Sequence, residues 1–296
     1  MDADVLVIGC GPAGIQAAIH ATRAGASVVV VGRPNGSAIY ASDVENYFGL
    51  PGAVSGEDLV RAGLDQMHSF GAVFVEGNIL SAAPADGGFS VKVEDGTVIA
   101  AKAVVLATGV SRRKLGVPGE KELFGKGVSY CAVCDCNFYK GKTVAIAGSQ
   151  SEAAVSADLM TKYASKVYWI SPSFDVDPSL KESAASAEVE ILQHSITRIC
   201  GEGKVSSVVL DDGSEISVDG VFIELGGKSS ADIAMDLGLM PELDDTIAVK
   251  RDCSTSVPGV FACGDVTGRP WQVAKAVGEG AVAGSSAASY VKKVGM

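Results

Sequence analysis

The chain has 296 residues, of which 47% are hydrophobic and 20% are charged. This composition is typical of a globular protein with one large or two ordinary domains, and it excludes a disordered or collagen-like chain. A net charge of −11 argues against nucleic acid or an anionic membrane surface as the main partner. No apolar run reaches the length of a membrane span and the start lacks the basic residues of a signal peptide, so we expect a cytoplasmic protein.

Strands and helices alternate in two similar stretches of the sequence. Each stretch reads as a strand, a helix and a second strand, over residues 5–8, 12–24 and 27–31 and again over 143–147, 151–164 and 166–170. Such βαβ units form parallel sheets that are covered on both faces. The sequence therefore predicts an α/β protein with two nucleotide-binding, Rossmann-like domains.

Other segments predict hairpins and a late helix. Residues 84–88 and 94–97 are expected to pair across a polar turn, as are 205–210 and 215–218 around Asp211-Asp212-Gly213. A helix is expected over 272–283.

The first chemical motif is a glycine-rich loop, Gly9-Cys10-Gly11-Pro12-Ala13-Gly14, between the first strand and helix. In this context the first glycine permits a tight turn, the second lets the backbone approach a pyrophosphate, and the third lets helix and strand pack closely. We interpret the loop as a dinucleotide site, with a plain glycine-rich corner as the alternative. Gly32 stands where an acidic residue usually binds the ribose, and Arg33 and Asn35 are candidate substitutes.

The second motif is Cys131-Ala132-Val133-Cys134-Asp135. Two cysteines at this spacing can form a redox-active disulfide, and a helix N-terminus can stabilise one thiolate. Zinc is an alternative that Cys136 would assist, but a structural zinc site needs four ligands, and His20, His68 and His194 are not paired. Two unreactive buried thiols are the other alternative. The remaining cysteines are scattered, and Cys10 and Cys263 are expected to be small packing residues.

Together the motifs resemble the low-molecular-weight thioredoxin reductase family, the FAD-dependent pyridine nucleotide-disulfide oxidoreductases of class II. The resemblance extends from residue 4 to about 290 and is carried by the CxxC motif and by 44–47 (VENY), 106–109 (LATG), 113–120 (RKLGVPGE) and 255–266 (TSVPGVFACGDV). It implies a homodimer and an FAD domain made of 1–114 and 243–296, into which a second Rossmann-like domain of 115–242 is inserted.

The resemblance also implies roles for single residues. Cys134 would lie next to the flavin, Cys131 would attack the partner disulfide, and Asp135 would manage the proton, with a helix N-cap as its structural alternative. The residues implied in FAD binding are Gly9, Gly11, Pro12, Ala13, Gly14, Asn46, Thr108, Gly109, Gly264, Asp265, Gln272 and Val273. A simple turn residue is the alternative for Asp265.

The middle domain departs from the family where the family binds NADPH. Its loop reads Gly148-Ser149-Gln150-Ser151-Glu152-Ala153, so a glutamine stands where only glycine allows the close approach of the pyrophosphate. The family's basic cluster for the 2′-phosphate is replaced by Ser171-Pro172-Ser173, and Trp271 replaces a basic residue before Gln272. The chain therefore resembles members that lack the NADPH motifs and use ferredoxin or a deazaflavin.

The sequence thus predicts an FAD-dependent disulfide reductase that passes electrons through Cys131 and Cys134 to thioredoxin or a similar small CxxC protein, with no metal. Ferredoxin or a deazaflavin is expected as the donor, and Arg112, Arg113 and Lys114 could attract an acidic ferredoxin unless they form only a solvated turn. The alternatives are an NAD(P)H-dependent enzyme with a remodelled loop, or a non-catalytic flavin-binding module with a cysteine metal site.

Overall fold

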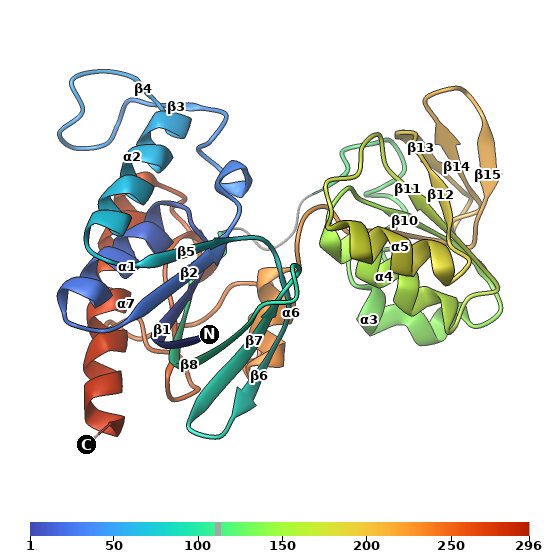
Figure 1. Cartoon of the computed structure of the whole chain (residues 1–296). Helices are drawn as coiled ribbons and strands as arrows, with labels where there is room; N and C mark the ends of the chain where they lie inside the picture. The colour runs from blue at the N-terminus through green and yellow to red at the C-terminus, as the bar shows by residue number, and fades with distance from the viewer. Residues whose placement is uncertain (110–113, 296) are drawn as a thin grey trace. The chain divides into compact units, whose positions relative to one another are not determined.

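The computed structural model describes residues 1–109 and 114–295. The chain divides into two compact units, of which unit 1 comprises Met1–Ser111 and Lys228–Met296, and unit 2 comprises Arg112–Gly227 (Figure 1). Both units contain a parallel sheet with βαβ connections, which confirms the expected α/β class.

Unit 1 contains a mixed sheet in the order β5-β2-β1-β8-β7-β6, with β17 paired to β8. Five strands, β5, β2, β1, β8 and β17, pair in parallel, and the crossover helices α1 and α2 connect β1 to β2 and β2 to β5. Its larger elements are β1 (Asp2–Ile8), α1 (Pro12–Arg23), β2 (Val28–Gly32), α2 (Gly56–Ser69), β5 (Val73–Glu76), β6 (Ile79–Ala85), β7 (Gly88–Val93), β8 (Val98–Leu106), α6 (Ser230–Asp236), β17 (Val260–Ala262) and α7 (Val273–Val294). Two short strands, β3 (Asp43–Val44) and β4 (Val54–Ser55), form a separate pair.

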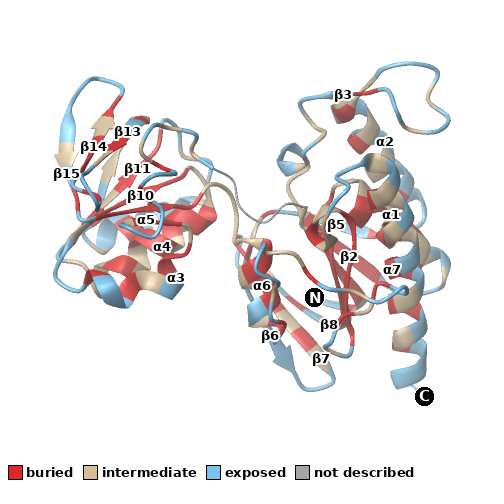
Figure 2. Ribbon diagram, turned by 180° about the vertical axis from the view of Figure 1, so that it is seen from behind, coloured by how far each residue is buried: buried red, intermediate tan, exposed pale blue. Residues whose placement is uncertain are grey.

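Strands β1 and β2 of this sheet are buried on both faces, as the red strands of unit 1 in Figure 2 show. Val5 and Val7 pack against α1, α2 and α7, whereas Leu6 and Ile8 belong to the core on the opposite face. That opposite core includes Ile233 from α6. Because α6 packs there, the chain returns to unit 1 at Lys228, earlier than the residue 243 expected from the sequence.

Unit 2 has a parallel sheet in the order β12-β11-β10-β16-β9. One face packs against α4 and α5, and the other packs against an antiparallel sheet of β13, β14 and β15. The elements are β9 (Val128–Ser129), α3 (Ala132–Asp135), β10 (Thr143–Ala147), α4 (Ser151–Thr161), β11 (Lys166–Ile170), α5 (Pro178–Ser186), β12 (Glu190–Leu192), β13 (Ile196–Cys200), β14 (Ser207–Leu210), β15 (Glu215–Ser217) and β16 (Gly220–Ile223).

One expected hairpin is confirmed and the other is wrong. Strands β14 and β15 pair antiparallel as expected. Residues 94–97, however, form the turn between β7 and β8, and β7 pairs with both β6 and β8. The Asp95 carboxylate accepts the backbone N–H and the hydroxyl of Thr97, and Gly96 has a φ of +86°, so this segment is a turn rather than a strand. Helix α4 ends at Thr161, earlier than 164, and α7 extends beyond 283 to Val294.

The contact between α1 and α7 depends on small residues. A Cβ added at Gly284 would lie 2.1 Å from the Ala17 carbonyl oxygen, so the two helix backbones approach too closely for a side chain. Gly278, on the same helix, has nothing within 4 Å of its added Cβ and is exposed.

These two glycines give opposite predictions. Gly284→Ala should lower the free energy of unfolding by about 1–3 kcal/mol, because the helices must move apart. Gly278→Ala should raise it by about 0.5–1 kcal/mol, because alanine favours a helix without any clash. Urea unfolding followed by circular dichroism measures both changes. Equal stabilisation of the two variants would contradict the close approach.

Candidate functional site

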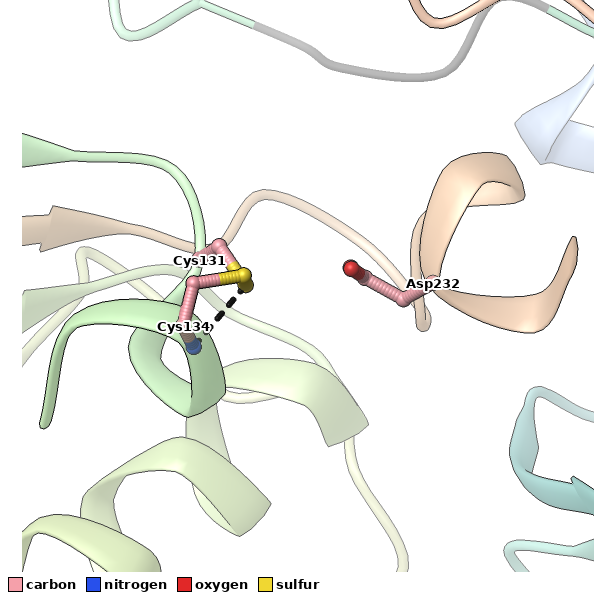
Figure 3. Close-up of side chains that lie close together, drawn as sticks. All are labelled: Cys131, Cys134 and Asp232. Atoms are coloured by element: carbon pink, nitrogen blue, oxygen red, sulfur yellow. Dashed lines mark hydrogen bonds between the residues drawn. A yellow bond between two sulfur atoms is a disulfide. The ribbon is translucent and has the colours of Figure 1, made fainter. Parts of the chain in front are cut away.

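Cys131 and Cys134 form a disulfide in unit 2, with their Cα atoms 5.3 Å apart (Figure 3). Cys131 follows strand β9 and is the N-cap of helix α3, and its sulfur accepts the backbone N–H of Cys134 at 3.2 Å. The Ser129 hydroxyl accepts the backbone N–H of Cys131 at 3.1 Å. Cys131 is buried and Cys134 is exposed. The CxxC spacing therefore produces the short disulfide loop expected of a redox pair.

Asp135 is the last residue of α3 and is half-buried. A helix N-cap is the alternative to the proton-transfer role expected for Asp135. The N-cap of α3 is Cys131, and the Asp135 side chain makes no capping hydrogen bond to the 3-10 helix that follows. Its carboxylate is therefore not engaged as a helix cap.

Cys136 packs in a core rather than beside the disulfide loop. It is 4% exposed, lies in the cluster that contains Tyr139 and Phe222, and donates its S–H to the Val133 carbonyl oxygen at 3.5 Å. The disulfide meanwhile engages the two sulfurs that a metal would need as thiolates. Burial raises the pKa of the Cys10 thiol to about 12 and also raises that of Cys263, so both remain protonated packing residues at neutral pH.

The glycine loop of unit 1 joins β1 to α1 at the carboxyl edge of the sheet. Gly9 has a φ of +110°, and a Cβ there would lie 2.2 Å from the Ala107 carbonyl oxygen. A Cβ on Gly14 would lie 1.8 Å from the Gly9 carbonyl oxygen. Gly11 is the N-cap of α1, followed by Pro12 and Ala13, and its added Cβ would meet only the Ser37 side chain, at 3.3 Å and beyond. The backbone at Gly11 is thus open to a ligand.

Other expected cofactor residues gather at the same edge of unit 1. Thr108 and Gly109 follow β8, while Gly264 and Asp265 follow β17, its neighbour. An added Cβ on Gly264 would lie 2.7 Å from the Ala13 Cβ, so this loop lies directly against the start of α1. Thr108 Oγ1 and Asp265 Oδ1 are buried and have no hydrogen-bond partner among the described residues. Burial also raises the pKa of Asp265.

Gln272 and Val273 mark the start of α7. Gln272 is the N-cap of the helix, and its side-chain oxygen accepts the amide N–H of Asn46 at 2.9 Å, which brings together two expected residues far apart in sequence. The adjacent Trp271 is 45% exposed, and the Arg269 guanidinium lies 4.2 Å from the centre of its ring.

Sequence reasoning missed the network that holds the Gly264-Asp265 loop. Lys275 Nζ donates to the Gly264 carbonyl oxygen at 2.8 Å, and Glu279 Oε2 accepts the Gly264 N–H at 2.8 Å. Both side chains also bond to Thr267. The spacing of Lys275 and Glu279 on one helix face is the only signal in the sequence that could have indicated the pair.

The structure also gives a reason for Gly32. A Cβ there would lie 2.9 Å from the backbone nitrogen and the sulfur of Cys10. Arg33, proposed as a substitute for the missing acid, is bound to Glu94 at 2.6 Å. Strand β5 brings Glu76 beside Gly32 in register, and the negative charge of Glu76 contributes to the raised pKa of Cys10. An exposed carboxylate therefore lies near the loop on a neighbouring strand.

The corresponding loop in unit 2 is closed by side chains. Gln150 is the N-cap of α4, the position that Gly11 has on α1. Its amide donates to Asp175 Oδ2 at 3.1 Å, and the Asp175 backbone N–H donates to the Ser149 carbonyl oxygen at 2.7 Å. Glu152 is buried in the first turn of α4, and its N–H donates to the Gly226 carbonyl oxygen. Two carboxylates thus lie where a pyrophosphate would need positive charge.

The segment after β11 also lacks the features of a nucleotide phosphate site. Ser171 is buried, and its backbone N–H donates to the Leu192 carbonyl oxygen. The Pro172 carbonyl oxygen accepts the Gln193 amide. Of the basic cluster considered for ferredoxin, Lys114 is exposed, while Arg112 and Arg113 lie outside the described residues.

Comparison with known proteins identifies the family. Residues 3–280 match the model of the pyridine nucleotide-disulphide oxidoreductases. Thioredoxin reductase of Aquifex aeolicus is 37% identical over 89% of this chain and 85% of its own. The atypical thioredoxin reductase TRi of Desulfovibrio vulgaris Hildenborough has a TM-score of 0.81 at 36% identity, covering 98% of both chains. A ferredoxin-flavin thioredoxin reductase of Clostridium acetobutylicum has a TM-score of 0.67 at 32% identity, covering 99% of this chain and 98% of its own.

The chain belongs to the pyridine nucleotide-disulphide oxidoreductase family. Within it, the chain is a disulfide reductase of the thioredoxin reductase type, which confirms the resemblance found in the sequence. The family consists of flavoproteins. Among the described residues, we find no helix with the length and apolar character needed to cross a membrane.

Proposed function

We propose that the chain is an FAD-dependent reductase that transfers electrons through the Cys131–Cys134 pair to thioredoxin or a similar CxxC protein, as a homodimer. The observation that carries this proposal is the disulfide at the start of α3. Reducing it consumes two electrons and two protons, and yields two thiols that can reduce the disulfide of another protein by exchange.

Residues of unit 1 fit FAD. The open backbone at Gly11 at the start of α1 suits a pyrophosphate, and the unpartnered Thr108 Oγ1 and Asp265 Oδ1 suit a ligand rich in hydroxyl and ring-nitrogen groups. Gly9, Gly14, Gly109 and Gly264 would shape the site, with Pro12 and Ala13 at the helix start. Gln272 and Val273 would direct the positive end of α7 at the flavin ring, and Asn46 would orient Gln272.

The bound flavin supplies the electron pair, and the chain supplies the thiols and the proton. Cys134 would be the sulfur that accepts electrons from a bound flavin, and the Cys131 thiolate released by reduction would attack the partner's disulfide. Asp135, whose carboxylate is not engaged as a helix cap, moves the proton. Accessibility alone favours the opposite roles, because Cys134 is exposed and Cys131 is buried. The two assignments give different spectra in the variants described below.

The donor we propose is ferredoxin or a deazaflavin rather than NADPH. The Gln150–Asp175 hydrogen bond closes the loop of unit 2, and the buried Glu152 adds negative charge at the same helix start. The segment after β11 supplies serine and proline where an arginine would bind the 2′-phosphate. Loss of such a charged pair together with a blocked loop should weaken nicotinamide binding by roughly 10³-fold or more.

The first prediction concerns FAD. The purified protein should be yellow with one FAD per chain, and Gly11→Leu should lose most of it, because the new side chain occupies the open backbone site. Absorbance and protein concentration give the FAD content. Gly52→Leu is the control, since an added Cβ at Gly52 meets nothing within 4 Å. Full FAD content in Gly11→Leu would contradict the site.

The second prediction separates the two thiols. Cys131→Ser should leave a thiolate beside the flavin and give a long-wavelength absorption band at mildly alkaline pH, whereas Cys134→Ser should not. Both variants should lose disulfide reductase activity with thioredoxin. A band only in Cys134→Ser would reverse the roles. Activity that survives in either variant would reject the mechanism.

The third prediction concerns the donor. In an anaerobic titration, micromolar NADPH or NADH should leave the flavin oxidised, whereas reduced ferredoxin or a reduced deazaflavin should bleach it. Dithionite serves as the control that the flavin is competent. Fast stoichiometric reduction by NADPH would refute the proposed donor and leave the disulfide reductase assignment intact.

A further inference from the structure

The buried side chain of Glu224 contacts the disulfide loop within unit 2. Glu224 follows strand β16 and is 6% exposed. Its Oε1 accepts the backbone N–H of Ala132, the residue after Cys131, at 2.9 Å. The same oxygen accepts the Ser156 hydroxyl from α4 at 3.4 Å. The Glu224 backbone is itself fixed, because its N–H donates to the Ala147 carbonyl oxygen of β10 at 2.8 Å.

This contact places a carboxylate, rather than a sulfur, on the first backbone N–H of α3. N–H groups at the start of a helix usually stabilise a cysteine thiolate and lower its pKa. Here the Cys134 N–H is directed at the Cys131 sulfur, but the Ala132 N–H is directed at a carboxylate. The carboxylate adds negative charge, which disfavours a thiolate nearby.

The elements packed around the pair supply further acidic groups. Asp135 lies on α3 itself, and Glu152 is buried in the first turn of α4, which packs against α3. Cys136 and Tyr139 lie on the 3-10 helix that follows α3, and the negative charge of Asp135 helps to raise the pKa of Tyr139. Lys142 adds one positive group, because its Nζ lies 5.3 Å from the centre of the Tyr139 ring, whereas Asp135 on α3 and Glu152 on α4 are acidic.

We propose that Glu224 is a positioning residue that keeps the Cys131 thiol protonated and makes the reduced pair a strong reductant. A dithiol pair is oxidising when its thiolate is stabilised, so a pair whose thiolate is opposed by a nearby negative charge releases its electrons more readily. This property suits a protein that must reduce other disulfides. The proposal rests on the proposed function only in taking Cys131 and Cys134 as the reacting pair, whose reduction adds two electrons and two protons.

The test is the thiol pKa of Cys131, measured in a Cys134→Ser background from the pH dependence of iodoacetamide alkylation, with the alkylated residue identified by mass spectrometry. Cys131 should titrate at or above the ordinary value of about 8.5. Glu224→Gln keeps an oxygen that can accept the Ala132 N–H but removes the charge. This substitution should lower the pKa of the Cys131 thiol by about one unit. Below that pKa, the thiolate population should therefore rise about tenfold.

Glu190→Gln is the matched control. Glu190 lies on β12, at the opposite edge of the same sheet from β9 and β16, so the same loss of charge there should leave the Cys131 pKa unchanged. In the protein with both cysteines, Glu224→Gln should make the pair up to about tenfold easier to reduce by dithiothreitol at pH values above the original thiol pKa.

Two outcomes would overturn the proposal. One is a Cys131 pKa near 7 in the protein that keeps Glu224. This measurement does not need the Glu224→Gln variant, so it is informative even if that variant does not fold. The other is an unchanged pKa in a folded Glu224→Gln protein, which would reduce Glu224 to a structural role. Failure of the proposed function would instead appear as reductase activity that survives without Cys131 or Cys134.

Discussion

The close approach of a helix N-terminus to the carboxyl end of a parallel strand is the constraint on which both units depend. In unit 1 the approach is possible because Gly14 places no Cβ against the Gly9 carbonyl oxygen. In unit 2 Gly148 has the position of Gly9, and an added Cβ there would lie 2.0 Å from the Glu224 carbonyl oxygen and 2.9 Å from the Ala153 Cβ in the first turn of α4, so this loop also requires glycine. The packing persists in both units, but only the loop of unit 1 leaves its helix start open to a ligand.

The two loops differ in the residue at the N-cap of the helix, although the folds of the two βαβ units are alike. Gly11 and Gln150 are N-caps of helices in equivalent βαβ units, and both helices form without a side-chain cap. Gln150 therefore does not damage the fold; with Asp175 it occupies the place of a ligand. The Rossmann-like architecture of unit 2 persists without an evident nucleotide site because its stability comes from the two cores on either side of its sheet.

The sequence predicted the fold where periodicity and glycine positions are local signals, as in the two βαβ units and the CxxC loop. It failed where distant contacts decide the structure. Residues 94–97 form a turn because Asp95 bonds to Thr97, and the chain returns to unit 1 early because the side chains of α6 complete a core made by distant strands. The contacts of Asp175 with Gln150 and of Glu224 with Ala132 escaped notice for the same reason, since each pair is separated by a stretch of sequence that no motif spans.

Glu224 contacts both the loop after β10 and the segment that carries the disulfide. Its carbonyl oxygen lies against Gly148, at the start of the closed loop, while its side chain holds the N–H next to Cys131. The end of one strand thus supports both the loop after β10 and the disulfide. In a parallel sheet the carboxyl ends of neighbouring strands meet at one edge, so a residue that follows β16 reaches both the loop after β10 and the helix after β9. The sequence of the loop after β10 can therefore change beside the disulfide without altering the strand that supports both.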